Sequence, residues 1–361
     1  MKVAFDYQIF SFQKYGGVSK YFCEMISCLP KDAWEIILKF SNNEYLAHKN
    51  LIQYQHFFNK LSFKGQNKVM SELNKIYALY RIPKITFDIF HPTNFNTYYL
   101  SKIRNKPVVT TFHDINVLRD IGNSRLAEIQ KRSIERSDKI IAVSNNTKKD
   151  IMELLNLSPS KIEVIYHGVD KPLPPWCIGE KIVDRDYILF VGRREESFKN
   201  FNKFAYVFSN IIKKKPFQDL MLVCTGTPFT FDEIKMFKDL KIEKNVLLIS
   251  ANENQMANLY TYANCFIFPS SYEGFGMPIL EAMSYSCPCV ISNTSSFPEI
   301  AQDAATYFDP MDIDDMYEKI ILIIDNNSIR KHNIKRGLEI SAELTWNLCA
   351  EKHMEVYKSL I

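Results

Sequence analysis

Several features that would mark a membrane-spanning, secreted or metal-binding protein are missing from this sequence of 361 residues. No apolar run approaches the roughly 18 to 20 residues that a membrane-spanning helix needs. The N-terminus lacks the basic start, apolar stretch and small-residue cleavage site of a signal peptide. The eight cysteines are scattered, and Cys287 and Cys289, which are close, match no zinc or redox spacing. We therefore expect a cytoplasmic protein with reduced cysteines and no bound metal.

A strong excess of charge of either sign is also missing. The chain has 45 Lys and Arg residues against 41 Asp and Glu residues, and the net charge of +4 does not by itself indicate nucleic acid binding. Hydrophobic residues make up 46% of the chain, which is typical of a globular protein. The length exceeds that of one ordinary hydrophobic core, so we expect two domains.

Apolar runs alternate with amphipathic segments on both sides of a stretch that contains Pro172, Pro174 and Pro175. These prolines break regular structure and indicate a linker. The expected strands are residues 2–5, 34–40, 85–90, 107–112, 139–143 and 163–165 before the linker, and 187–191, 220–225, 245–249, 265–268 and 288–291 after it. This alternation predicts an α/β protein with two parallel-sheet domains.

The linker sets the expected domain boundaries. They are an N-terminal domain at 1–170, a linker at 171–186, a C-terminal domain at 187–340, and a helix at 341–361 that returns to the N-terminal domain. Ligands of parallel sheets bind beyond the carboxyl ends of the strands. We therefore expect the site in a cleft between the two domains.

Glycine is scarce, and most of the eleven glycines stand where a predicted strand ends or a helix begins. These are Gly16, Gly17, Gly168, Gly192, Gly226, Gly274 and Gly276. Glycine permits tight turns and close approach of the backbone to a ligand. The alternative is that each simply ends a strand, as glycines do in many α/β proteins.

The most informative segment is residues 269–283, which follows an apolar run and leads through Gly274 and Gly276 to Pro278. Proline is favoured at the first position of a helix, and the free N–H groups of a helix start attract anions. Glu273 and Glu281 bracket this helix start and can accept hydrogen bonds from hydroxyl groups. A ligand that is both phosphate and sugar fits this pattern, so we expect a nucleotide-sugar.

A second charged motif follows the predicted strand 187–191. Arg193 and Lys199 lie six residues apart and can neutralise a diphosphate, the first with two hydrogen bonds and the second as a point charge. The alternative is a solvated loop in which Glu195 and Glu196 pair locally with these cations.

These residues resemble glycosyltransferase family 4, whose donor site contains two glutamates separated by seven residues, as Glu273 and Glu281 are. The resemblance covers nearly the whole chain, and it is closest to mannosyltransferase-like enzymes of bacterial surface polysaccharide synthesis. The other matching segments, in order, are residues 15–19, 110–114, 141–144, 165–168, the Arg193 and Lys199 pair, 259–263 and 297–299. Ser286 stands where a glycine is usual and Met277 where a leucine is common; both are small departures on the packing side of the donor helix, and they bear on the donor preference more than on activity.

The resemblance implies a GT-B fold of two Rossmann-like domains and sugar transfer with retention at the anomeric carbon, without a metal or other cofactor. It also implies roles for single residues. Arg193 and Lys199 would hold the donor diphosphate, Glu281 the ribose hydroxyls and Glu273 the transferred sugar. The amides of Gly274, Phe275, Gly276 and Met277 would contact sugar and phosphate, Gly16 and Gly17 would approach the diphosphate, and His113 would lie near the attacked bond.

The leading hypothesis is a hexosyltransferase that uses GDP-mannose or a related donor and a saccharide or lipid-linked acceptor. Such an enzyme would act in the synthesis of a bacterial polysaccharide or lipopolysaccharide (O-antigen). Alternatives are a nucleotide-sugar epimerase of GT-B fold and a non-catalytic nucleotide-sugar-binding scaffold. His113 could also merely cap a turn, and we expect His91 and His167 to be structural.

One further segment, residues 58–84, combines six Lys and Arg residues with a single acid, Glu72, and interleaved aromatic residues. Such a segment can bind the anionic surface of a membrane from the cytoplasmic side. The alternative is a solvated helix whose apolar stripe faces the core.

Overall fold

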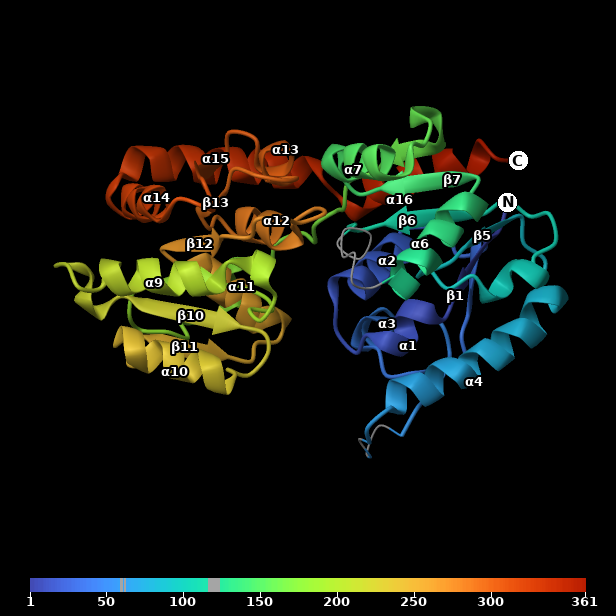
Figure 1. The fold of residues 1–361 in the computed structure, drawn as a ribbon, viewed down its shortest axis with the longest axis horizontal. Coiled ribbons are helices and arrows are strands. Elements are labelled where there is room, and N and C mark those ends of the chain that lie inside the picture. The colour runs from blue at the N-terminus through green and yellow to red at the C-terminus, as the bar shows by residue number, and fades with distance from the viewer. Residues whose placement is uncertain (59–60, 62, 116–123) are drawn as a thin grey trace. The chain divides into compact units, whose positions relative to one another are not determined.

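The computed structural model describes the chain except residues 59–60, 62 and 116–123, and it divides into two compact units (Figure 1). The first unit comprises Met1–Gly168 together with Trp346–Ile361, and the second comprises Val169–Thr345. The expected linker, 171–186, thus belongs to the second unit. Both units have parallel sheets with helices between successive strands, so the α/β prediction is confirmed.

The first unit contains two three-stranded parallel sheets with the orders β2-β1-β5 and β6-β7-β8. The strands are β1 (Val3–Asp6), β2 (Trp34–Ile37), β5 (Ile89–His91), β6 (Val109–Phe112), β7 (Lys139–Ala142) and β8 (Ile162–Val164). A bridge between Phe90 and Val108 links the two sheets. All residues of β1, β5 and β6 are buried, because helices cover such sheets on both faces. A short pair, β3 (Phe40–Ser41) with β4 (Gln55–His56), was not expected.

The helices of the first unit are α1 (Gln8–Phe12), α2 (Gly17–Ser27), α3 (Glu44–Lys49), α4 (Gln66–Arg81), α6 (Ser124–Arg136), α7 (Asn145–Leu155) and α16 (Trp346–Lys358). Local signals fix several of their starts. Ser144, for example, caps α7 by accepting a hydrogen bond from the Thr147 N–H group. Helix α16 packs against α2, so the last described helix completes the first unit.

The second unit has one six-stranded parallel sheet with the order β11-β10-β9-β12-β13-β14. The strands are β9 (Tyr187–Phe190), β10 (Met221–Thr225), β11 (Val246–Ile249), β12 (Cys265–Phe268), β13 (Cys289–Ser292) and β14 (Ala305–Phe308). The chain starts at β9, runs outward to β11, and returns to the other side of β9 at β12. The direction of winding therefore reverses between β9 and β12, where doubly wound sheets bind ligands.

The helices of the second unit are α8 (Pro175–Ile178), α9 (Phe201–Ile211), α10 (Phe231–Leu240), α11 (Glu253–Tyr262), α12 (Met277–Ser284), α13 (Phe297–Ala301), α14 (Ile313–Asp325) and α15 (Asn327–Glu343). Helices α9 and α14 pack on one another over the sheet, and their apolar residues join those of β9 and β10 in a single core. The capping boxes Thr230 with Glu233 and Asn252 with Gln255 fix the starts of α10 and α11.

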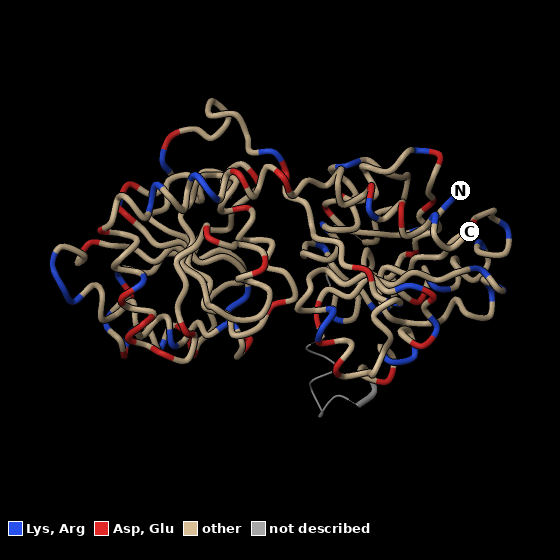
Figure 2. Tube along the Cα trace, turned by 90° about the horizontal axis from the view of Figure 1, so that it is seen from above, with Lys and Arg blue, Asp and Glu red and all other residues tan. Residues whose placement is uncertain are grey.

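Charges of both signs are interspersed along both units (Figure 2). All eight cysteines are free. Within the described ranges, no helix is long and apolar enough to cross a membrane.

Candidate active site

Two of the sequence motifs follow the strands that flank the reversal point of the second unit. The segment with Arg193 and Lys199 follows β9, and the segment with Glu273 follows β12, the strand beside it. The end of β10 also lies close to the end of β9. A Cβ atom on Gly226, which follows β10, would lie 2.7 Å from the carbonyl oxygen of Gly192, which follows β9. Both glycines have a φ angle of 112°, a backbone conformation that residues with a side chain rarely adopt. The fold thus brings the expected donor-binding residues of this unit to one edge of the sheet.

The two neighbouring arginines after β9 have different surroundings. Arg194 is buried, and its Nε lies 2.7 Å from a carboxylate oxygen of Glu233, while its Nη2 donates to the Thr227 carbonyl at 2.6 Å. Arg193 is exposed and forms no hydrogen bond or ion pair with the part of the chain that the structure describes. Arg194 therefore fixes the loop, and Arg193 is left to face solvent or a ligand. No role was predicted for Arg194 from the sequence.

Lys199 and Glu273 form an ion pair in which Nζ lies 2.5 Å from Oε1. Their side chains are only 14% and 18% exposed, so solvent weakens this pair less than it weakens surface pairs. The backbone of Glu273 is held as well, because its carbonyl accepts hydrogen bonds from Ser295 and Ser296 at 2.5 and 3.1 Å. The site therefore contains a fixed cation with a fixed carboxylate beside it.

Helix α12 begins at the end of the Glu273 loop. Its N-cap residue, Gly276, has φ of 97°, and a Cβ atom there would lie 3.0 Å from Ile279 Cδ1 and 3.1 Å from Phe297 Cε1. Pro278 follows within the first turn, and no side chain of the described residues caps the helix start. These first N–H groups and the positive end of the helix dipole can therefore bind an anion.

Glu281 lies one turn into α12 and is half-buried. Its Oε2 accepts a hydrogen bond from the Tyr260 hydroxyl at 3.2 Å. Burial, and then the charge of Glu281, raise the pKa of Tyr260 well above its usual range, so this tyrosine stays a neutral donor. Tyr260 thereby orients a carboxylate expected to bind hydroxyl groups, a role that the sequence did not assign.

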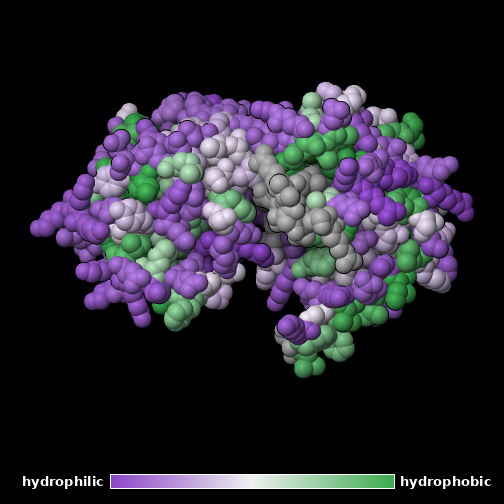
Figure 3. All heavy atoms as spheres, viewed as in Figure 1, coloured by the Kyte–Doolittle hydropathy of each residue, from purple (hydrophilic) through white to green (hydrophobic). Residues whose placement is uncertain are grey.

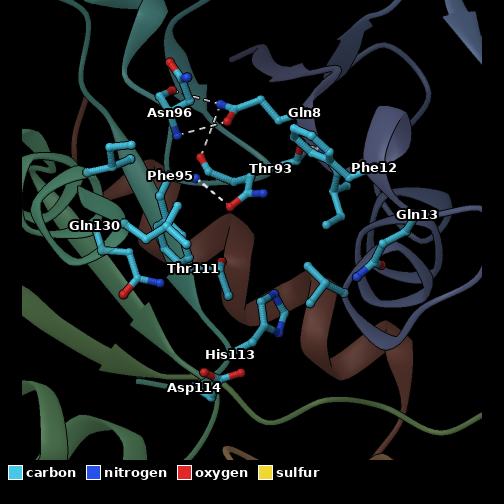
Figure 4. A pocket seen from close by; sticks show the side chains of 15 residues that line it. Gln8, Phe12, Gln13, Thr93, Phe95, Asn96, Thr111, His113, Asp114 and Gln130 are labelled. Carbon is cyan, nitrogen blue, oxygen red and sulfur yellow. Dashed lines mark hydrogen bonds between the residues drawn. The ribbon is translucent and has the colours of Figure 1, made fainter. Parts of the chain in front are cut away.

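The first unit contains a pocket of about 430 Å³ at the carboxyl ends of its strands (Figure 4). It is lined by residues from α1 and the segment after it, the start of α2, the loop after β5, the end of β6 and the residues that follow it, and α6. They are Gln8, Ile9, Phe12, Gln13, Val18, Thr93, Asn94, Phe95, Asn96, Thr111, His113, Asp114, Leu126, Ile129 and Gln130. The predicted site residue His113 lies in this pocket.

A buried carboxylate holds one wall of the pocket in place. Asp6, at the end of β1, accepts hydrogen bonds from the Thr93 N–H and hydroxyl groups at 2.9 and 2.8 Å and from Gln8 Nε2 at 2.7 Å. Gln8 Oε1 in turn accepts from the Asn96 N–H group at 2.9 Å. Burial raises the pKa of Asp6, and these hydrogen bonds partly oppose the rise. The sequence pattern did not reveal this network because its members are far apart in the chain.

His113 follows β6 and presents its imidazole to the pocket. Its Nε2 is buried and has no hydrogen-bond partner among the described residues. Burial, with a smaller contribution from His353, lowers the pKa of His113 to about 3, so the ring is neutral. The ring of Tyr21 packs edge-on against it, with 4.7 Å between ring centroids. A neutral imidazole with a free nitrogen can form a hydrogen bond to a sugar hydroxyl.

Gly16 and Gly17 stand at the start of α2, beside the same pocket. The Gln13 side chain occupies the position that a Cβ atom on Gly16 would take, and its Oε1 accepts a hydrogen bond from the Ser19 N–H group at 3.0 Å. The absence of a side chain at Gly16 thus leaves room for the Gln13 amide, whose oxygen binds one N–H group at the start of α2.

Behind His113, buried side chains join α16 to α2. His353 Nδ1 lies 2.7 Å from the Cys349 carbonyl, which can only accept, so Nδ1 donates and Nε2 accepts from the Tyr21 hydroxyl at 2.6 Å. His91 continues the network between the Tyr357 hydroxyl at 2.7 Å and the Thr111 hydroxyl at 3.0 Å.

His91 and His167 are both buried, as expected of structural residues, and the His167 ring stacks on Trp346. Burial lowers the pKa of His91, His167 and His353. All three imidazoles are therefore neutral at pH 7.

Two family models match the chain in succession. "Glycosyltransferase Family 4" matches residues 15–171 and "Glycosyl transferases group 1" matches residues 179–339. This chain belongs to glycosyltransferase family 4. It is therefore an enzyme of the retaining GT-B glycosyltransferases, and the predictions of family, fold and enzyme class are confirmed.

Two relatives of this family 4 glycosyltransferase are bacterial mannosyltransferases. The O-antigen chain mannosyltransferase B of Escherichia coli is 26% identical over 288 residues, which cover 75% of this chain and 74% of that protein. The O-antigen chain mannosyltransferase RfbU of Salmonella typhimurium is 29% identical over 235 residues, which cover 59% of this chain and 64% of that protein.

Solved structures share the fold at low identity. HepE of Anabaena, in complex with UDP and glucose, has a TM-score of 0.78 and 16% identity over the full length of both chains. Sucrose-phosphate synthase of Thermosynechococcus elongatus has a TM-score of 0.76 and 16% identity, covering 100% of this chain and 99% of its own. At this identity the likeness supports the GT-B fold alone.

Proposed function

We propose that this glycosyltransferase transfers a hexose from a nucleotide-sugar, with GDP-mannose as the first candidate. The acceptor is a saccharide or a lipid-linked saccharide in bacterial polysaccharide or lipopolysaccharide (O-antigen) synthesis. The similarity to two O-antigen mannosyltransferases supports the sugar and the process. The observation that carries the donor site is the Lys199–Glu273 ion pair beside the uncapped start of α12.

The proposed chemistry follows from where charge develops. Breaking the bond between sugar and diphosphate places negative charge on the leaving diphosphate and positive charge on the anomeric carbon. Arg193, Lys199 and the first amides of α12 stabilise the leaving group, because fixed donors stabilise developing charge without reorganising. These groups supply the positive charge that Mg²⁺ supplies in other transferases, so the reaction is proposed to need no metal.

The carboxylates have separate roles in this proposal. Glu281, oriented by Tyr260, accepts hydrogen bonds from the ribose hydroxyls. Glu273, together with the amides of Gly274, Phe275, Gly276 and Met277, contacts the transferred sugar. In the first unit, His113 accepts or donates a hydrogen bond at the sugar as a neutral imidazole, and the pocket around it binds the acceptor.

A panel of nucleotide-sugars tests the reaction. We expect one of GDP-mannose, GDP-glucose, UDP-glucose, UDP-galactose and UDP-N-acetylglucosamine to raise the thermal unfolding midpoint and to be hydrolysed slowly without an acceptor. Glu273→Gln and His113→Ala should each lower hydrolysis at least tenfold, because both residues are proposed to contact the sugar. Glu253→Gln, an exposed substitution in the second unit, is the matched control.

The alternatives give different results in the same assay. An epimerase would convert the donor into its epimer, and a scaffold would bind a nucleotide-sugar without turning it over, with the two variants unchanged. If no GDP- or UDP-sugar binds or is hydrolysed, the proposed function is wrong.

The structure bears on the proposed membrane contact of residues 58–84. One stripe of α4, with Met70, Asn74 and Ala78, is buried. A second stripe at helical spacing is exposed and apolar, and comprises Val69, Leu73, Ile76 and Tyr80. Apolar side chains are visible along the margin that α4 occupies in Figure 1 (Figure 3). Lys68 and Lys75 lie on the same helix, so a surface both apolar and basic is available to an anionic bilayer.

Vesicle binding tests this contact. We expect the protein to co-sediment with vesicles that contain phosphatidylglycerol. The double variant Lys64→Glu, Lys68→Glu removes positive charge, and the double variant Leu73→Ser, Ile76→Ser removes apolar surface. Each should weaken binding at least tenfold. Lys60, part of the same prediction, lies outside the described residues. Lys213→Glu with Lys214→Glu in the second unit is the charge-matched control. Equal binding by all variants would contradict the proposal.

A further inference from the structure

We propose that Gln130 is a specificity-determining residue of this enzyme, whose side-chain oxygen accepts a hydrogen bond from a hydroxyl group of an uncharged acceptor sugar. This inference rests on the proposed function, because it identifies the chemistry by which the pocket of the first unit recognises its acceptor. Gln130 belongs to α6 and lies outside the short motifs, such as residues 110–114 and 141–144, that carry the family resemblance.

The first observation is an unpartnered polar atom. Gln130 is 4% exposed and lines the pocket, and its Oε1 has no hydrogen-bond partner among the described residues. A buried acceptor without a donor costs free energy, and such groups are usually satisfied by protein, water or a ligand. The Gln130 oxygen is therefore open to a donor that arrives with the ligand.

The other amide oxygens of the pocket are already engaged. Gln8 Oε1 accepts from the Asn96 N–H group and Gln13 Oε1 from the Ser19 N–H group. Asn94 Oδ1 accepts from the Phe95 N–H group at 2.8 Å, and Asn96 Oδ1 accepts from the Tyr98 N–H group at 3.0 Å. Those four amides shape the wall, whereas Gln130 Oε1 is left to bind a ligand. Figure 4 shows the Thr111 side chain between those of Gln130 and His113.

The rest of the lining indicates the class of ligand. Phe12, Phe95, Leu126 and Ile129 supply apolar surface, which suits the C–H face of a pyranose ring. Among the described lining residues the formally charged group is the carboxylate of Asp114, so the described lining offers no Lys or Arg side chain to a phosphate or carboxylate group. Amide oxygen, neutral imidazole, apolar surface and negative charge together fit a neutral sugar unit better than a phosphorylated one.

The test uses the full chain and two small probes, methyl α-D-mannopyranoside and mannose 6-phosphate, with binding followed by saturation-transfer NMR. We expect the neutral probe to bind at least tenfold more tightly than the phosphorylated one. Gln130→Met should weaken binding of the neutral probe at least tenfold, since it keeps the side-chain volume but removes the acceptor. The control, Gln53→Met, changes an exposed glutamine of the same unit and should bind like the unmodified protein.

A stability measurement separates ligand binding from a structural role. Gln130→Met should leave the thermal midpoint unchanged or raise it, because it removes a buried acceptor that no protein group satisfies. A lowered midpoint with unchanged probe binding would show a structural residue and overturn the inference. Failure of the unmodified protein to bind the neutral probe would also overturn it, and donor hydrolysis in the same preparation would show that the proposed function still holds.

Discussion

Replacing Lys199 by alanine is expected to lower kcat/KM for the nucleotide-sugar on the order of 10²- to 10³-fold. The substitution removes a cation from the proposed diphosphate site and leaves the Glu273 carboxylate, now 2.5 Å from Lys199 Nζ, without this partner. Without Lys199, the Glu273 carboxylate adds negative charge near the proposed leaving group and opposes the negative charge that develops there. The substitution therefore raises the energy of the transition state in two ways, by the loss of a cation and by the remaining carboxylate. We expect kcat to fall more than KM rises.

Steady-state kinetics of donor hydrolysis, or of transfer once an acceptor is known, measure this effect. Lys199→Arg should recover part of the activity, because it restores the charge with a different geometry. Lys213→Ala, an exposed lysine of the same unit, should behave like the unmodified enzyme. A fall of less than threefold for Lys199→Ala, with the fold intact, would contradict the proposed role.

Acid is expected to unfold the first unit near pH 5, before the second. Four histidines of the first unit, His91, His113, His167 and His353, have folded pKa values below the unfolded value of about 6.5, with His113 at about 3 and His353 at about 4. Below pH 6.5 the unfolded chain therefore binds protons that the folded unit does not. The contribution of these histidines to the free energy of unfolding is fully present above pH 6.5. Below pH 6.5 it falls by roughly 1 kcal/mol for each histidine and each pH unit. The whole free energy of unfolding of a protein is typically only about 5 to 15 kcal/mol.

Urea unfolding at pH 7.5, 6.5, 5.5 and 4.5, followed by circular dichroism and tryptophan fluorescence, measures this slope. His332→Gln, which replaces an exposed histidine of the second unit, is the matched control. His353→Gln should reduce the slope, since glutamine does not titrate and can still accept from Tyr21. A stability that is constant from pH 7.5 to 4.5 would contradict the prediction.

Much of the fold follows from local sequence. The eleven expected strands are present within a few residues, because buried parallel strands give continuous apolar runs. Strand β14 was not expected: it lies at the edge of the sheet, and Ala305 and Tyr307 are partly exposed, so its apolar pattern is weak. The pair β3 and β4 has two residues in each strand, too few for a pattern.

The candidate site was predictable only in part. Sequence spacing marked the loop of Glu273 and the start of α12, because both belong to one continuous segment. It did not distinguish Arg193 from Arg194, since only the position of Glu233 in the fold buries one of them. Gln130 could not be recognised, because an unpartnered oxygen depends on which donors the folded chain brings near it.

The membership of α16 in the first unit has a consequence for synthesis on the ribosome. Residues 1–168 emerge first, but Tyr21 and His91 receive their partners His353 and Tyr357 only when residues 346–361 have been made. The second unit lies wholly between them in the chain and can complete its core earlier. The usual order, in which the N-terminal domain folds first, is thus expected to be reversed. The newly made first unit must wait with an incomplete core that chaperones can recognise.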